Sequence, residues 1–169
     1  ICFNGLMMEV VFFTKFLKGL DVEAVGRTAK RLGFDGLDLA IREGQCVDAS
    51  NIRTVLPVAM AVWKSMGLSV PLATLGAYER DPACKEVRSI YEACGEAGIP
   101  FIKLGYWLWA KEHHYWDQVA RIRTDLEQFQ TLSRRCGVTT LFHTHSDQFY
   151  GSNASGVMHL VRNFDPSQI

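Results

Sequence analysis

Two histidines follow an apolar segment in the last third of the chain. Residues 138–142 read VTTLF, a β-branched and apolar run that predicts a buried strand, and His143 and His145 come directly after it. Because side chains alternate along a strand, residues two apart are expected to leave it on the same face. Imidazoles at the end of a parallel strand are typical of α/β functional sites, where they bind metals or transfer protons. Hydrogen-bonded wall residues would give the same pattern, and the residues alone leave both readings open.

Charged residues follow two earlier apolar segments. Lys15 comes after residues 10–14, where its ammonium could meet a phosphate or an oxyanion, although a solvated lysine would look the same. Residues 34–41 place Asp38 and Arg42 on one strand face, opposite the apolar Leu37, Leu39 and Ile41. Asp38 is expected to form an ion pair with Arg42 or Lys103. Arg42, at the strand end, has the planar fork that suits carboxylate or phosphate.

An aromatic segment follows the predicted strand at residues 99–105. Tyr106, Trp107 and Trp109 could line a sugar pocket and exclude water from it, or they could pack under a long loop. His113 and His114 open the next predicted helix, and helix entry explains them better than metal binding.

The elements that position these residues alternate between strand and helix. Predicted strands at residues 10–14, 34–41, 68–74, 99–105 and 138–142 are separated by amphipathic helical segments, with a last helix over residues 152–163. This alternation predicts right-handed crossovers and a parallel sheet in one domain, residues 1–169. Two folds fit, an open doubly wound sheet or a β/α barrel cut short of its eight units. The segment after the first strand is no glycine-rich phosphate loop, which disfavours the doubly wound fold.

Composition excludes several classes of protein. The formal net charge is zero, so no basic footprint for nucleic acid is expected, and no apolar run approaches the roughly 20 residues of a membrane span. The five cysteines are scattered without a CxxC pair, which is typical of a reduced cytoplasmic protein.

Several phrases in order carry a resemblance to a known family. FTK at residues 13–15, LGFDGLDL at 32–39, KLGYW at 103–107, HTHS at 143–146 and the closing Asp165-Pro166 resemble the sugar phosphate isomerase/epimerase family. That family has the xylose-isomerase-like TIM barrel. The resemblance spans residues 12–165 and implies a partial barrel of about five βα units. We expect the chain to be the N-terminal part of such a barrel, inactive by itself.

The resemblance also implies a chemistry. A divalent metal (Mn, Mg, Co or Zn) would assist isomerisation or epimerisation of a sugar or sugar phosphate, by proton transfer next to a carbonyl through an enediolate. His145 would be a metal ligand, and the substrate would be bound by Lys15, Arg42, Tyr106, Trp107 and His143. Many relatives have a glutamate ligand where this chain has histidines, and the remaining ligands and the catalytic bases would lie on later strands.

Other functions stay open on the sequence. A polyol-binding barrel without catalysis and an inosose-dehydratase-like lyase both fit, whereas an endonuclease is disfavoured by the neutral charge. The expected partner is a small sugar, with neither nucleic acid nor membrane, and a homo-oligomer is compatible with the sequence.

Overall fold

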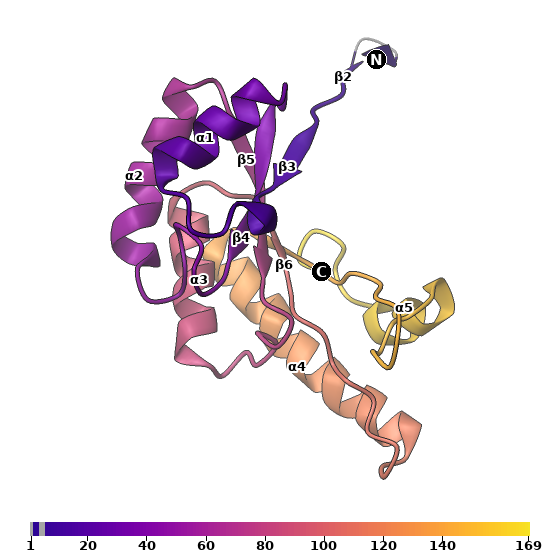
Figure 1. Ribbon diagram of the computed structural model, residues 1–169. Coiled ribbons are helices and arrows are strands. Elements are labelled where there is room, and N and C mark those ends of the chain that lie inside the picture. The colour runs from indigo at the N-terminus through magenta and orange to yellow at the C-terminus, as the bar shows by residue number, and fades with distance from the viewer. Residues whose placement is uncertain (1, 4–5) are drawn as a thin grey trace.

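Five parallel strands form one sheet in sequence order. The computed structural model describes residues 2–3 and 6–169, and the sheet consists of β3 (Val11–Phe13), β4 (Gly36–Ile41), β5 (Ser69–Leu75), β6 (Phe101–Lys103) and β7 (Thr139–Leu141) (Figure 1). Each strand pairs with the next along the chain. A doubly wound sheet would reverse its order about the first strand. The sequential order therefore confirms the partial β/α barrel.

A helix follows each strand. They are α1 (Val22–Arg31), α2 (Ile52–Ser65), α3 (Lys85–Glu96), α4 (Tyr115–Cys136) and α5 (Ala154–Val161), with a short 3-10 helix η1 (Thr14–Leu17) and an antiparallel pair β1 (Cys2–Phe3) and β2 (Leu6–Met7) near the start. Consecutive helices pack on one another, and α1, α2 and α3 lie together on one side of the sheet (Figure 1).

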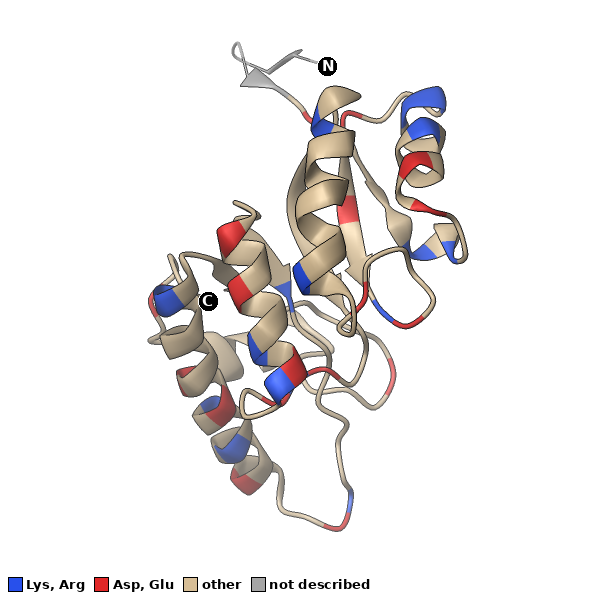
Figure 2. Cartoon of the chain, turned by 90° about the vertical axis from the view of Figure 1, so that its left-hand side faces the viewer, with Lys and Arg blue, Asp and Glu red and all other residues tan. Residues whose placement is uncertain are grey.

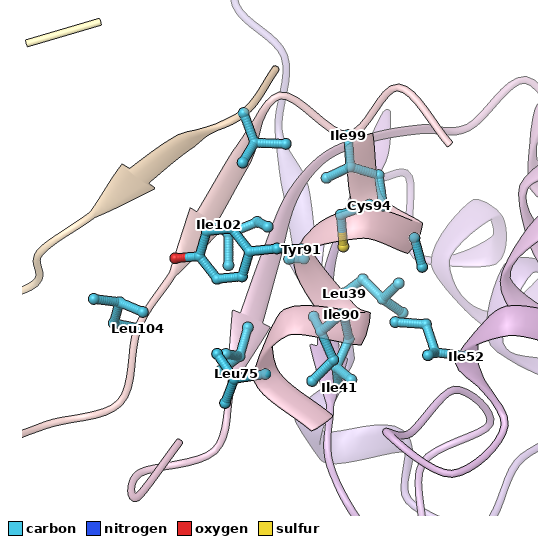
Figure 3. Close-up of a cluster of buried hydrophobic side chains, with 14 of the residues drawn as sticks. Leu39, Ile41, Ile52, Leu75, Ile90, Tyr91, Cys94, Ile99, Ile102 and Leu104 are labelled. Carbon is cyan, nitrogen blue, oxygen red and sulfur yellow. The ribbon is translucent and has the colours of Figure 1, made fainter. Parts of the chain in front are cut away.

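The hydrophobic core lies between the sheet and these helices. Leu37, Leu39 and Ile41 of β4 are fully buried there, as the alternation predicted, and Ile102 of β6 faces the same side (Figure 3). Tyr91 of α3 fills the space beside Ile102. The other face of the sheet is left for side chains of the opposite parity.

The helix boundaries follow local chemistry. The Asp21 carboxylate accepts a hydrogen bond of 2.7 Å from the Ala24 amide and caps α1, and Asn153 caps α5 in the same way. Helix α2 begins at Ile52, directly after Asn51. Its Pro57 lies in the second turn.

A buried hydroxyl triad joins three elements beneath β7. The Thr140 hydroxyl lies 2.7 Å from the Tyr91 hydroxyl of α3 and 2.7 Å from the Ser133 hydroxyl of α4. All three side chains are buried. Each hydroxyl therefore finds its partner inside the protein, which fixes β7 against the two helices.

On the side of the sheet that the helices cover, acidic and basic residues are interspersed, and neither sign of charge dominates (Figure 2). None of the helices in residues 2–3 and 6–169 has the length and apolar character needed to span a membrane.

Candidate functional site

The inner face of the sheet gathers polar side chains from three neighbouring strands. In the parallel register Ala40 is opposite Thr74, and Thr74 is opposite Lys103. Asp38, two residues before Ala40, belongs to the same face. Since the residues of the other parity fill the core, Asp38, Thr74 and Lys103 are directed away from the helices, to the inner face of the sheet.

Asp38 is held by a hydroxyl. Its Oδ1 accepts a hydrogen bond of 2.7 Å from the Thr74 hydroxyl. Burial raises the pKa of the Asp38 carboxyl, and the bond from Thr74 and the charges of Lys103, Arg42 and His143 oppose that rise only in part. Across residues 2–3 and 6–169 no cation lies within 4.0 Å of Asp38, so the expected ion pair with Arg42 or Lys103 is not formed.

The sequence predicted for Lys103 only a role as an ion-pair partner of Asp38. Its side chain is 8% exposed, and its Nζ lies 4.0 Å from the centroid of the Tyr106 ring, within cation–π range. Burial, with the positive charges of Arg42 and Lys15, lowers the pKa of Lys103 to about 8, although Asp38 acts in the opposite direction. The signal available in the sequence was a lysine at a strand end, directly before an aromatic loop.

Arg42 and Lys15 border the same region. The Arg42 Nη2 donates to the Leu75 carbonyl at 3.0 Å, and its guanidinium lies 5.5 Å from the Phe13 ring. The Gln45 side-chain amide donates to the Lys15 carbonyl at 3.1 Å and fixes η1, so that the exposed Lys15 side chain stays near Lys103. The predicted substrate-binding cations therefore lie on one rim, around Lys103.

The two histidines lie in different surroundings. The exposed His143 is close enough to Asp38 to influence its pKa. His145 packs edge-on against Tyr106 and Phe149, with centroids 4.4 Å and 4.9 Å apart, and its Nδ1 lies 2.8 Å from the Ser146 carbonyl oxygen. Strand β7 ends at Leu141, so the strict alternation that predicted a shared face does not reach them.

Trp107 does not join this cluster. Its indole Nε1 donates to Asp125 of α4 at 3.1 Å, and its ring stacks on Phe142 with the planes 7° apart. The side chain belongs to the hydrophobic core. This corrects its expected place in the sugar pocket: Trp107 anchors the aromatic loop to α4, while its neighbour Tyr106 faces the site.

The aromatic loop is held by backbone contacts on both sides. The Tyr106 amide donates to the Ala77 carbonyl at 2.7 Å, and a Cβ on Gly105 would lie 2.7 Å from that same oxygen, so only glycine fits there. On the other side the Trp109 amide donates to Gln148. Beside this contact lies a cavity of about 330 Å³, lined by aromatic and polar residues that include Trp109, Tyr115, Asp147, Gln148, Phe149 and Asn153.

The described residues do not fit a divalent metal. Within residues 2–3 and 6–169 no three His, Cys, Asp or Glu side chains come together to hold one. The predicted ligand His145 is surrounded by aromatic rings, and Asp38 shares its surroundings with Lys103, Arg42 and His143. Such an excess of positive charge suits an oxyanion better than a cation.

Solved structures superpose on most of the chain, whereas no family model and no curated protein sequence matches it. A 3-keto-D-glucoside 4-epimerase from E. coli superposes with a TM-score of 0.72 at 16% identity over 93% of this chain. A D-psicose 3-epimerase studied with D-fructose gives 0.64 at 13% over 92%, and a xylose isomerase-like TIM barrel protein from Mycobacterium smegmatis in complex with magnesium gives 0.66 at 9% over 92%. The chain spans 65%, 61% and 60% of these three chains, respectively. These likenesses establish the fold, a partial β/α barrel.

Proposed function

We propose that the protein is a sugar isomerase or epimerase, to which this chain contributes the substrate-orienting half of the site. One observation carries the proposal: the buried Lys103, at the carboxyl end of β6, and the half-buried carboxylate of Asp38 lie together on the inner face of the barrel strands. Barrel enzymes place their chemistry at this end. Two fold relatives are named as sugar epimerases, which supports a sugar as the substrate class.

The residues have distinct parts in proton transfer next to a carbonyl. The cations Arg42 and Lys15 orient the sugar and stabilise the oxyanion that develops as the neighbouring C–H bond breaks. Burial moves the pKa of the Asp38 carboxyl up toward neutral pH, which suits this group to accept and return a proton. Tyr106 and Phe149 wall the site and limit its water.

Solvent exchange tests the proposal directly. The protein is incubated in D₂O with a panel of ketoses, and deuterium at the carbon next to the carbonyl is followed by NMR together with the appearance of epimers. We expect exchange with at least one ketose, and a loss of at least about 100-fold in Asp38→Asn, because a positioned acid or base contributes about that much. The exposed Asp117→Asn serves as the matched control. No exchange with any ketose would refute an isomerase or epimerase.

A further inference from the structure

One charged side chain stands apart from all others in the molecule. Among the side chains of residues 8–169, Lys103 is the only lysine, arginine, aspartate or glutamate that is buried. Lysine is rarely buried unless it is paired with a carboxylate, because burying an isolated charge costs on the order of several kcal/mol. A buried lysine therefore calls for a partner or a role.

Lys103 has no such partner in the described part of the chain. No hydrogen bond and no ion pair joins its Nζ to residues 2–3 or 6–169. The nearest carboxylate, Asp38, is bonded to the Thr74 hydroxyl, and the Lys103 Nζ lies over the face of the Tyr106 ring instead. The amine is thus held in place by an aromatic ring and left free of an acceptor.

Its position suits a carbonyl ligand. Lys103 projects from the sheet face opposite the core, near the two cations Arg42 and Lys15 that can hold the oxygen atoms of a ligand. Neighbouring cations and an apolar wall are the surroundings that activate lysine as a nucleophile.

We propose that Lys103 captures the carbonyl carbon of an open-chain sugar as a reversible imine. That the ligand is a sugar rests on the proposed function; that the amine is nucleophilic does not. The nitrogen lone pair attacks the carbonyl carbon and forms a carbinolamine, whose hydroxyl leaves as water with a proton taken from solvent. Amine and carbonyl give imine and water, so no oxidant or reductant is needed. The protonated imine withdraws electrons from the adjacent C–H bond, and hydrolysis restores Lys103.

The protonation state of the amine supports this chemistry. With the pKa of Lys103 lowered from 10.5 to about 8, its neutral, nucleophilic fraction at pH 7 is about 300-fold larger than that of an ordinary lysine. Below pH 8 the reactive fraction grows about tenfold per pH unit.

Reductive trapping tests the inference. The folded protein is treated with dihydroxyacetone and cyanoborohydride, and the modified lysines are mapped by peptide mass spectrometry. Lys85 at the start of α3 is exposed and serves as the internal control. We expect Lys103 to be modified about 100-fold faster than Lys85 at pH 7, with a half-maximal rate near pH 8, and we expect urea to abolish the preference. Equal rates in the folded protein, or modification of exposed lysines alone, would overturn the inference.

Variants separate this inference from the proposed function. Lys103→Arg keeps the charge and is expected to lose both trapping at that position and ketose exchange, whereas Lys85→Arg keeps both. Trapping at Lys103 without exchange on any ketose refutes the proposed function and leaves the imine. Ketose exchange that persists at full rate in a folded Lys103→Arg protein refutes the imine and leaves the function.

Discussion

The buried hydroxyl triad makes Thr140 the most informative position for stability. Thr140→Val keeps the shape of the side chain but removes both hydrogen bonds, which leaves the hydroxyls of Tyr91 and Ser133 buried without a partner. An unsatisfied buried hydroxyl costs about 1–3 kcal/mol, so two give a loss of roughly 2–6 kcal/mol in the free energy of unfolding. Tyr91→Phe removes one bond and leaves Thr140 bonded to Ser133, and its cost is about 1 kcal/mol.

Urea unfolding followed by circular dichroism measures both variants and their combination. In the Tyr91→Phe background, Thr140→Val leaves only the Ser133 hydroxyl without a partner. The loss of unfolding free energy caused by Thr140→Val is therefore expected to be about 1 kcal/mol smaller in that background. For a chain of this size each kcal/mol moves the melting temperature by about 2–4 °C, which gives an independent measure. A cost below about 0.5 kcal/mol for Thr140→Val, or strict additivity of the two substitutions, would show that the triad does not fix β7.

Two further tests address packing and charge. Gly95→Ala in α3 is expected to destabilise the protein by about 1–3 kcal/mol, because the new Cβ would collide with the Cys136 carbonyl at the end of α4, whereas Gly156→Ala in α5 has room and should be neutral or stabilising in thermal melts. Lys103→Met is expected to stabilise the protein at pH 7 by about 1–2 kcal/mol, since the buried charge is removed. The pKa of Lys103 is lowered in the folded state, so the unfolded chain binds more protons between about pH 8 and 10.5 and wild-type stability rises there. Urea titrations across that range should show the rise in the wild type and a flatter curve in the variant; a steeper curve in Lys103→Met would contradict the burial of the charge.

The sheet could be predicted from the sequence because its signal is strong and local. Apolar runs of β-branched residues, each followed by an amphipathic helix, predicted five parallel strands, and all five are present within one or two residues of the predicted ends. The errors lie at helix ends, where packing rather than periodicity decides. Leu32, just after α1, and Trp116, in the first turn of α4, continue the apolar stripes of these helices, yet they are 56% and 51% exposed.

The site could be predicted only in part. That Lys15, Arg42 and Tyr106 lie near one rim could be predicted because parallel strands bring their carboxyl ends to one edge; their role as substrate-binding residues stays a prediction. Trp107 and Tyr106 were assigned together, although Trp107 bonds to Asp125 and stacks on Phe142, while the Tyr106 ring lies against Lys103 and His145. Lys103 was undervalued because its burial depends on Tyr106 and on the strands at both sides, which no single stretch of sequence contains.

The strand register that buries the core also determines which side chains face the site. On β6 the residue before Lys103 is Ile102, which is fully buried against the helices, and on β4 Asp38 stands between the buried Leu37 and Leu39. A slip of one residue in either strand would drive the charged side chain into that core and expose the apolar one. The cost of burying an unpaired charge there far exceeds the cost of holding Lys103 at the semi-open inner face, where solvent and the Tyr106 ring still reach it. The hydrophobic effect that selects the register therefore also brings the lysine and the carboxylate to the same face of the barrel.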